Sequence, residues 1–347
     1  MPINWGEIKS RKIRDAFRVA LSDDKHLSHS EVVDVLRSAL DDGYLSSEEI
    51  SDLNKVAKTS ETIMPRSKFM LLNLAYEAFR VSGYGPINFS TGTQKYAADI
   101  LCGFLKRMGQ PYFPRLDRDL VGIDLLLRVS NPNIINQQNA GLCGPVAFLY
   151  SLAFDQPAVY AKFGIDLFEK GKAKIGRFDI EPSFDCRHYL PPPPISHGEW
   201  LTAGRLRDSA NFFFDYDSVE ASGSSTNDEL ADWFERAGYT DVHNDDNTFM
   251  SRGAGDITLI NRYYNDGYRV MLRINSKLLY AETQADSSHR GNHFVVLRSP
   301  ITVVGQTVRL TVYSWGLGQH DIPAPKTQLT PGEFLEHWYG YVAAKSF

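Results

Sequence analysis

The chain of 347 residues is 43% hydrophobic and 23% charged, with a formal net charge of −5. This composition is that of an ordinary globular protein and excludes collagen, wholesale disorder and disulfide-dense mini-proteins. Neither half of the chain carries the basic excess that nucleic-acid binding usually needs. Three cysteines are too few for a disulfide framework and indicate a reducing compartment or a protein that uses a thiol.

No apolar run reaches the length of about 18 residues that a transmembrane helix needs, so we expect none. The first residues, MPINWGEIKSRKIRDAF, lack the apolar segment and the small-residue cleavage site of a classical signal peptide. We therefore expect a cytoplasmic protein, or one that is secreted by a signal-less route and acts in the cytoplasm of a target cell.

Residues 1–125 are predicted to form a small all-helical domain with a docking or targeting role. Ser28 with Glu31 and Ser46 with Glu49 both match the capping box that begins a helix. The acidic turn before Ser46 lacks the alternating carboxylates of a calcium-binding EF-hand loop, so helix capping is the favoured interpretation. Two further helices are expected over about 67–81 and 94–108.

Residues 126–347 show a different pattern, with one central helix followed by strands. Expected in chain order are a helix over about 143–154, a long irregular region containing four prolines, a capped helix over about 230–237, strands over 269–274, 293–297 and 308–315, and a short helix that begins after Thr330. Strands that follow one another in this way pair antiparallel, so the fold class is α+β and not a series of βαβ units.

Cys143 stands at the predicted start of the central apolar helix, after a polar segment that contains a glycine. Backbone N–H groups at a helix start favour an anion, so they are expected to favour the Cys143 thiolate and to lower its pKa. Gly144 is expected to let a substrate backbone approach closely. The pattern predicts a nucleophile; the alternative is a buried structural cysteine.

A thiol nucleophile needs a base on a separate element, and His293 stands at the head of an apolar strand. The wide gap from Cys143 to His293 is typical of papain-type enzymes. His289 is the rival base, and a strand-end histidine bonded to a carbonyl is the structural alternative. Gln137 lies six residues before the cysteine, and its amide is expected to hold an oxyanion together with the Cys143 N–H. Gln138 is the alternative donor, and both glutamines would otherwise be exposed loop residues.

At these residues the sequence resembles the papain-like cysteine peptidase superfamily. The segments Cys143-Gly144-Pro145 and His293–Leu297 are most similar to the bacterial double-glycine-leader peptidases, often called C39-like, and to papain-like domains of bacterial effectors and toxins. The resemblance covers about residues 131–320. It implies a papain-like cysteine-peptidase fold, in which a helical lobe led by Cys143 and an antiparallel β lobe bearing His293 enclose the site.

One position departs from the family pattern. In papain-like enzymes an Asn before Ser-Trp-Gly orients the histidine, but here that residue is Tyr313. The Asp expected in C39-like enzymes is also absent between His293 and Trp315. Ser314 is our choice for the third role, and Trp315 is expected to pack beside the imidazole. Tyr313, a backbone carbonyl, Asp321 and a Cys–His dyad without a third residue remain alternatives.

The resemblance implies a cysteine peptidase that cleaves a protein through a thioester, as a bacterial effector or toxin, with a preference for Gly-Gly before the cut. The same Cys–His geometry serves glutamine deamidases, transglutaminases and arylamine-type acyltransferases, and the departure at Tyr313 leaves a non-catalytic binding module open.

We expect no cofactor. No metal site is expected either, because the region around Cys186 and His188 lacks the usual ligand spacings. Expected partners are a protein or peptide substrate and an immunity protein or secretion apparatus, with no nucleic acid and no membrane.

Overall fold

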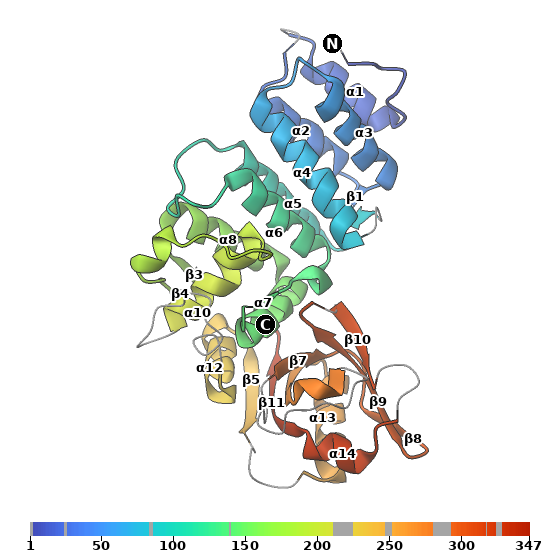
Figure 1. Cartoon of the computed structure of the whole chain (residues 1–347), viewed down its shortest axis with the longest axis vertical. Coiled ribbons are helices and arrows are strands. Elements are labelled where there is room, and N and C mark those ends of the chain that lie inside the picture. The colour runs from blue at the N-terminus through green and yellow to red at the C-terminus, as the bar shows by residue number, and fades with distance from the viewer. Residues whose placement is uncertain are drawn as a thin grey trace.

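The computed structural model describes residues 3–23, 26–82, 86–138, 140–210, 225–246, 252–279, 293–316, 318–323 and 328–347. Helices occupy the N-terminal part and the middle of the chain, and an antiparallel sheet occupies the C-terminal part (Figure 1). The α+β class expected from the sequence is confirmed. Within the described ranges, no helix is both long and apolar enough to cross a membrane.

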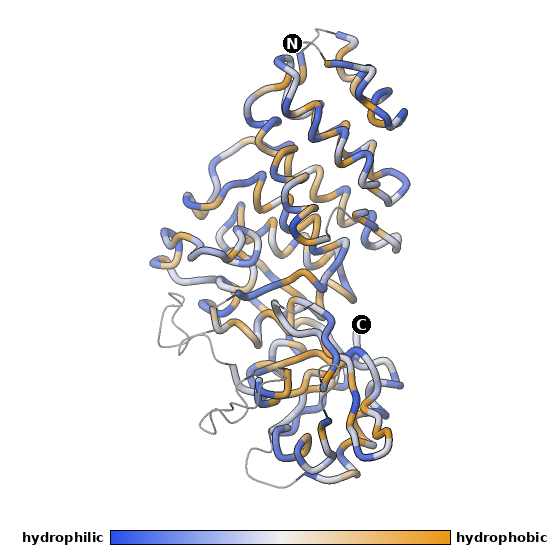
Figure 2. Tube along the Cα trace, turned by 45° about the vertical axis from the view of Figure 1, so that its right-hand side comes forward, coloured by the Kyte–Doolittle hydropathy of each residue, from blue (hydrophilic) through white to orange (hydrophobic). Residues whose placement is uncertain are grey.

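Four helices form the N-terminal end of the molecule: α1 (Arg11–Ala20), α2 (His29–Ala39), α3 (Ser47–Thr59) and α4 (Pro65–Ser82). The capping boxes at Ser28 and Ser46 are confirmed. In each box the serine side chain accepts the backbone N–H of the glutamate three residues later, and the side chain of that glutamate accepts the backbone N–H of the serine. Lys12 forms ion pairs with Asp41 and Asp42 of the acidic turn. Apolar and hydrophilic residues alternate along these helices (Figure 2), so each buries one face.

The middle of the molecule is also helical. It contains α5 (Gly92–Lys106), α6 (Arg118–Ser130), α7 (Cys143–Asp155), α8 (Pro157–Lys170), α9 (His197–Glu199), α10 (Arg205–Ala210) and α12 (Asn227–Ala237). Helix α5 packs on α2 at one side and on α6 and α8 at the other. The boundary expected between residues 125 and 126 falls inside α6, which runs without a break and also packs on α4. The N-terminal helices and the region after residue 126 therefore share this helix.

The C-terminal sheet has the strand order β10-β9-β7-β6-β11-β5, and every pair in it is antiparallel. Its strands are β5 (Thr240–Asp246), β6 (Tyr268–Ile274), β7 (His293–Leu297), β9 (Thr307–Ser314), β10 (Gly318–Ile322) and β11 (Trp338–Lys345), with β8 (Thr302–Val304) paired to β9. Helix α13 (Ala254–Asn265) packs on β6, and helix α14 (Pro331–Glu336) packs on β9 and β11. Two further two-stranded antiparallel sheets lie elsewhere: β1 (Tyr44–Leu45) with β2 (Ile87–Asn88), and the hairpin of β3 (Ala173–Ile175) with β4 (Phe178–Ile180).

Helix α7 links the helical part to the sheet, because it packs on both α8 and β7. Its residues are buried from Cys143 to Ala153. At its last residue, Asp155 accepts two hydrogen bonds from the Arg269 side chain of β6 and one from the hydroxyl of Tyr239. The helix is thus fixed to the sheet at its C-terminal end, and its first residue, Cys143, lies against β7.

The elements predicted around the site are confirmed. Helix α7, strands β6, β7 and β9, the capped helix α12 and the proline-started helix α14 all lie where the sequence placed them. The helices α8 and α13 and the strands β5, β10 and β11 had not been predicted. Strand β11 is apolar along nearly its whole length, because both of its faces are covered, and so lacks the alternation of a half-buried strand.

Candidate active site

The Cys143 side chain lies at the junction of helix and sheet. Cys143 is the first residue of α7, and only 8% of it is exposed. Its thiol accepts hydrogen bonds from the backbone N–H groups of Phe294 and Gly144. Phe294 is the second residue of β7 and directly follows His293. The Cys143 thiol therefore lies against the backbone of the strand that begins with His293.

Burial raises the pKa of the Cys143 thiol, although the backbone N–H groups of Phe294, Gly144 and Cys143 itself act to lower that pKa. The sequence led us to expect a lowered pKa from the helix start alone. That expectation was wrong because the thiol is enclosed by protein, and loss of water disfavours the thiolate more than the backbone groups favour it. The resting form of Cys143 is the neutral thiol.

The His293 imidazole is held from one side by β9. Its Nε2 atom lies 3.2 Å from the Ser314 hydroxyl oxygen, and its ring packs on Trp315 with 3.5 Å between ring centroids. No other hydrogen-bond partner of this imidazole is found in the part of the chain that the structure describes, so Nδ1 is unpaired there. Burial lowers the pKa of the imidazole to about 3. The ring is therefore neutral at neutral pH.

Among the candidates for the third residue, only Ser314 contacts the imidazole in the described structure. Tyr313 points elsewhere: its hydroxyl donates to the Ile135 carbonyl at 2.6 Å and its ring stacks on Tyr150. Asp321 lies on β10 and accepts a hydrogen bond from Thr311. The departure from the family pattern at Tyr313 thus leaves the histidine with a partner one residue later.

The two glutamines before Cys143 differ in their surroundings. Gln137 is only 8% exposed, and its side-chain oxygen has no hydrogen-bond partner although it is buried. A turn closed by the Ala140 N–H and the Gln137 carbonyl brings the chain back toward α7. Gln138 is partly exposed and has a positive φ of 53°. The atom without a partner is the amide oxygen, which accepts hydrogen bonds, whereas the oxyanion role expected for Gln137 would use the N–H donors of the same amide.

Gly144 has a different role from the one that its sequence position indicated. A Cβ atom at this residue would lie 2.4 Å from the hydroxyl oxygen and 2.5 Å from the Cβ of Ser225. The space beside the Gly144 Cα is therefore filled by the protein itself, just before α12. The expected approach of a substrate backbone at this atom was wrong.

The sequence also raised His289, Cys186 and a metal site as candidates. His289, the rival base, lies outside the described residues. Cys186 lies in a 3-10 helix, Asp185–His188, and burial raises its thiol pKa to about 12. Within the described ranges, no group of three or more His, Cys, Asp or Glu side chains is arranged to hold a metal ion.

Several groups near the site were not predicted. They are the Phe294 N–H at the thiol, the Tyr313 hydroxyl on Ile135, and the buried carboxylate of Glu199, which accepts the N–H of Asn136 at 2.9 Å. Each contact joins residues far apart in the sequence, so no local pattern could have indicated them. Comparisons of the chain with protein-family profiles, curated proteins and solved structures found no match.

Proposed function

We propose that the protein is a thiol hydrolase of the cysteine-peptidase type, with Cys143 as nucleophile and His293 as base. One observation supports this above the rest: the buried Cys143 thiol meets the first residues of β7, where Ser314 holds the adjacent His293 by Nε2. A structural cysteine needs neither an imidazole oriented by a hydroxyl at the start of the neighbouring strand nor a buried glutamine whose side-chain oxygen has no partner.

The proposed reaction begins from a neutral pair. Because burial disfavours both the thiolate and the imidazolium, the proton of the Cys143 thiol moves to His293 as sulfur bonds to the substrate carbonyl carbon. The carbonyl oxygen becomes an oxyanion that the Cys143 N–H and the Gln137 amide stabilise. His293 then protonates the leaving amine as the carbon–nitrogen bond breaks, and a thioester remains. Water, deprotonated by His293, hydrolyses the thioester and restores the thiol.

The substrate in this proposal is the peptide bond of a protein, with Gly-Gly before the cut as the first sequence to try. The same thioester forms when the attacked carbonyl belongs to a glutamine side chain. Mass spectrometry separates the two reactions, since a peptidase shortens its substrate, whereas deamidation adds about one mass unit without cleavage.

The proposal is tested by the pH dependence of iodoacetamide labelling at Cys143, read by peptide mass spectrometry, in the wild type and in His293→Ala. A buried thiol without a base labels only well above its ordinary pKa of about 8.5. We expect wild-type Cys143 to label already between about pH 6 and 8, at a rate that changes little with pH because neutral His293 takes the proton as the bond to sulfur forms, and we expect this labelling to be lost in His293→Ala. Cys186 and Cys102, both buried, are internal controls for unfolding.

Slow labelling of Cys143 with the same alkaline profile in both proteins would refute the proposal. A binding module would then be the better interpretation.

A further inference from the structure

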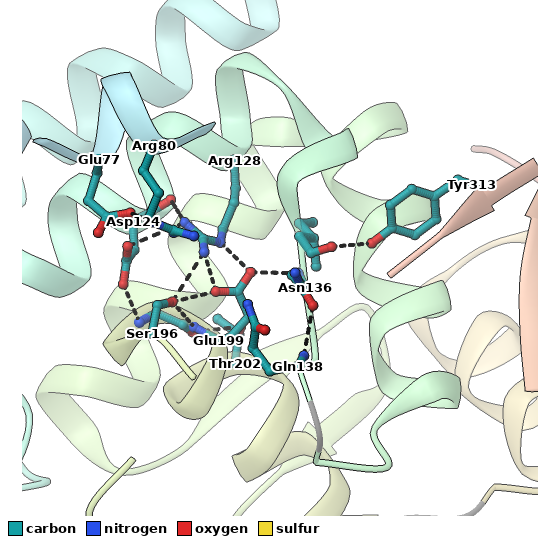
Figure 3. Close-up of polar contacts among 12 residues, drawn as sticks. Glu77, Arg80, Asp124, Arg128, Asn136, Gln138, Ser196, Glu199, Thr202 and Tyr313 are labelled. Atoms are coloured by element: carbon teal, nitrogen blue, oxygen red, sulfur yellow. Dashed lines mark hydrogen bonds and ion pairs between the residues drawn. The ribbon is translucent and has the colours of Figure 1, made fainter. Parts of the chain in front are cut away.

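The segment of Ile135 to Gln138, here called the Gln137 segment, is held at its first peptide group by two buried side chains. Oε1 of Glu199 accepts the Asn136 N–H at 2.9 Å (Figure 3). At the other end of the same peptide group, the Tyr313 hydroxyl donates to the Ile135 carbonyl at 2.6 Å. Glu199 belongs to α9 and Tyr313 to β9, so two elements distant in sequence fix one short stretch.

The Glu199 carboxylate is itself fixed by charge. Arg128 of α6 donates from Nε to Oε1 of Glu199 at 2.6 Å and from a terminal nitrogen to Oε2. Ser196 also donates to Oε2. Arg128 contacts Asp124 one turn earlier on α6, and both members of the Arg128–Glu199 pair are almost fully buried. A buried ion pair is a costly way to gain stability, but it holds its partners in a single geometry when its hydrogen bonds are complete.

A hydrogen bond within the Gln137 segment also constrains the backbone on the far side of Gln137. The Asn136 side-chain oxygen accepts the Gln138 N–H at 2.7 Å, and this bond supports the left-handed backbone of Gln138, which non-glycine residues rarely adopt. Gln137 stands between these two residues. Its backbone is therefore fixed on both sides, while its own side-chain oxygen has no partner.

We propose that Glu199 is a positioning residue: fixed by Arg128, its carboxylate holds the Asn136 N–H and thereby places the Gln137 amide for the oxyanion. This inference rests on the proposed function. It assigns a role in the reaction to a charge pair outside the Cys143–His293 site. The donor must lie within hydrogen-bond distance of an oxyanion that exists only during the reaction, so a displacement of about 1 Å costs as much as about 100-fold in rate.

The test uses two double variants that differ only in the acceptor at position 199. Arg128→Met with Glu199→Gln, the acceptor-retaining variant, removes both charges but keeps an oxygen for the Asn136 N–H. Arg128→Met with Glu199→Met, the acceptor-free variant, removes the charges and the acceptor. Changing Glu199 alone is avoided because it would leave the buried Arg128 with Asp124 as its remaining ion-pair partner, and breaking one side of a buried charge network is strongly destabilising.

Two probes of Cys143 separate positioning from folding. Acetylation by p-nitrophenyl acetate passes through an oxyanion, whereas alkylation by iodoacetamide is a direct displacement and forms none. We expect the acceptor-free variant to acetylate about 10- to 100-fold more slowly than the acceptor-retaining variant, with equal alkylation rates in the two. Tyr313→Phe, which keeps the stacked ring and removes the bond to Ile135, is the second test and is expected to lower acetylation selectively as well.

Equal acetylation rates in the two double variants would overturn the proposal, and so would a parallel loss of acetylation and alkylation, which would show a structural role only. If the acceptor-free variant does not fold, as judged by circular dichroism, Tyr313→Phe decides by the same ratio. Failure of the proposed function is recognised separately, because acetylation of Cys143 in the wild type would then be no faster than in His293→Ala.

Discussion

Substitution of Gly144 by alanine should displace the start of α7, since the new methyl group would occupy the space of Ser225. The added Cβ would lie 2.4 Å from the Ser225 hydroxyl oxygen and 2.5 Å from its Cβ, well inside ordinary van der Waals contact. Overpacking of this kind costs about 1–3 kcal/mol, and the better helix propensity of alanine returns about 1 kcal/mol at most. We expect Gly144→Ala to lower the free energy of unfolding by about 1–2 kcal/mol, and to slow acetylation of Cys143 because the thiol moves.

The matched control is Ser225→Gly, which removes the atoms that the methyl group would meet. Arg207 donates to the Ser225 hydroxyl at 3.1 Å but also pairs with Glu229, so it keeps a partner. The double variant should recover most of the stability lost in Gly144→Ala, with a coupling of about 1–2 kcal/mol between the two sites. Urea unfolding of the four proteins measures this coupling.

Additive effects of the two substitutions would refute the packing argument.

Two further substitutions test the electrostatics of the site and of the network beside it. Ser314→Ala removes the Nε2 partner of His293, a bond worth about 1 kcal/mol, so acetylation of Cys143 should slow about fivefold with little change in melting temperature; an unchanged rate would contradict the orienting role. Burial raises the pKa of the Asp124 carboxyl to about 6 despite the neighbouring Arg128, so folding favours its protonated form. Relative to Asp124→Asn, the wild type should therefore be most stable below about pH 4 and should lose up to about 3 kcal/mol as pH rises through about 6. Urea unfolding of both proteins from about pH 4 to 7 measures this difference, and a difference constant with pH would contradict it.

The features that the sequence predicted well are those with local causes. A capping box is complete within four residues, and the boxes at Ser28, Ser46 and Thr226 all begin helices. Strand alternation identified β6, β7 and β9. The candidates Cys143 and His293 were chosen from a predicted helix start and a predicted strand start, and the structure has α7 begin at Cys143, β7 begin at His293 and the two elements packed together.

The features that were missed or wrong depend on burial and on contacts between distant residues. The backbone N–H groups at the helix start do favour the Cys143 thiolate. Burial against β7 raises the thiol pKa nonetheless, and this strand lies far from the cysteine in the sequence, so the residues around Cys143 could not indicate it. The role of Gly144 depends on Ser225 in the same way. Local chemistry therefore indicated which residues to examine, and only the fold could determine the direction of their pKa shifts.

Strand β9 contacts both His293 and the segment before Cys143 through two adjacent residues. Successive side chains of a strand point to opposite faces. Tyr313 uses one face to hold Ile135, and Ser314 uses the other to hold His293. Tyr313 and Ser314 are adjacent in β9. The same stretch of backbone therefore contacts both the proposed base and the segment that carries the proposed oxyanion donor.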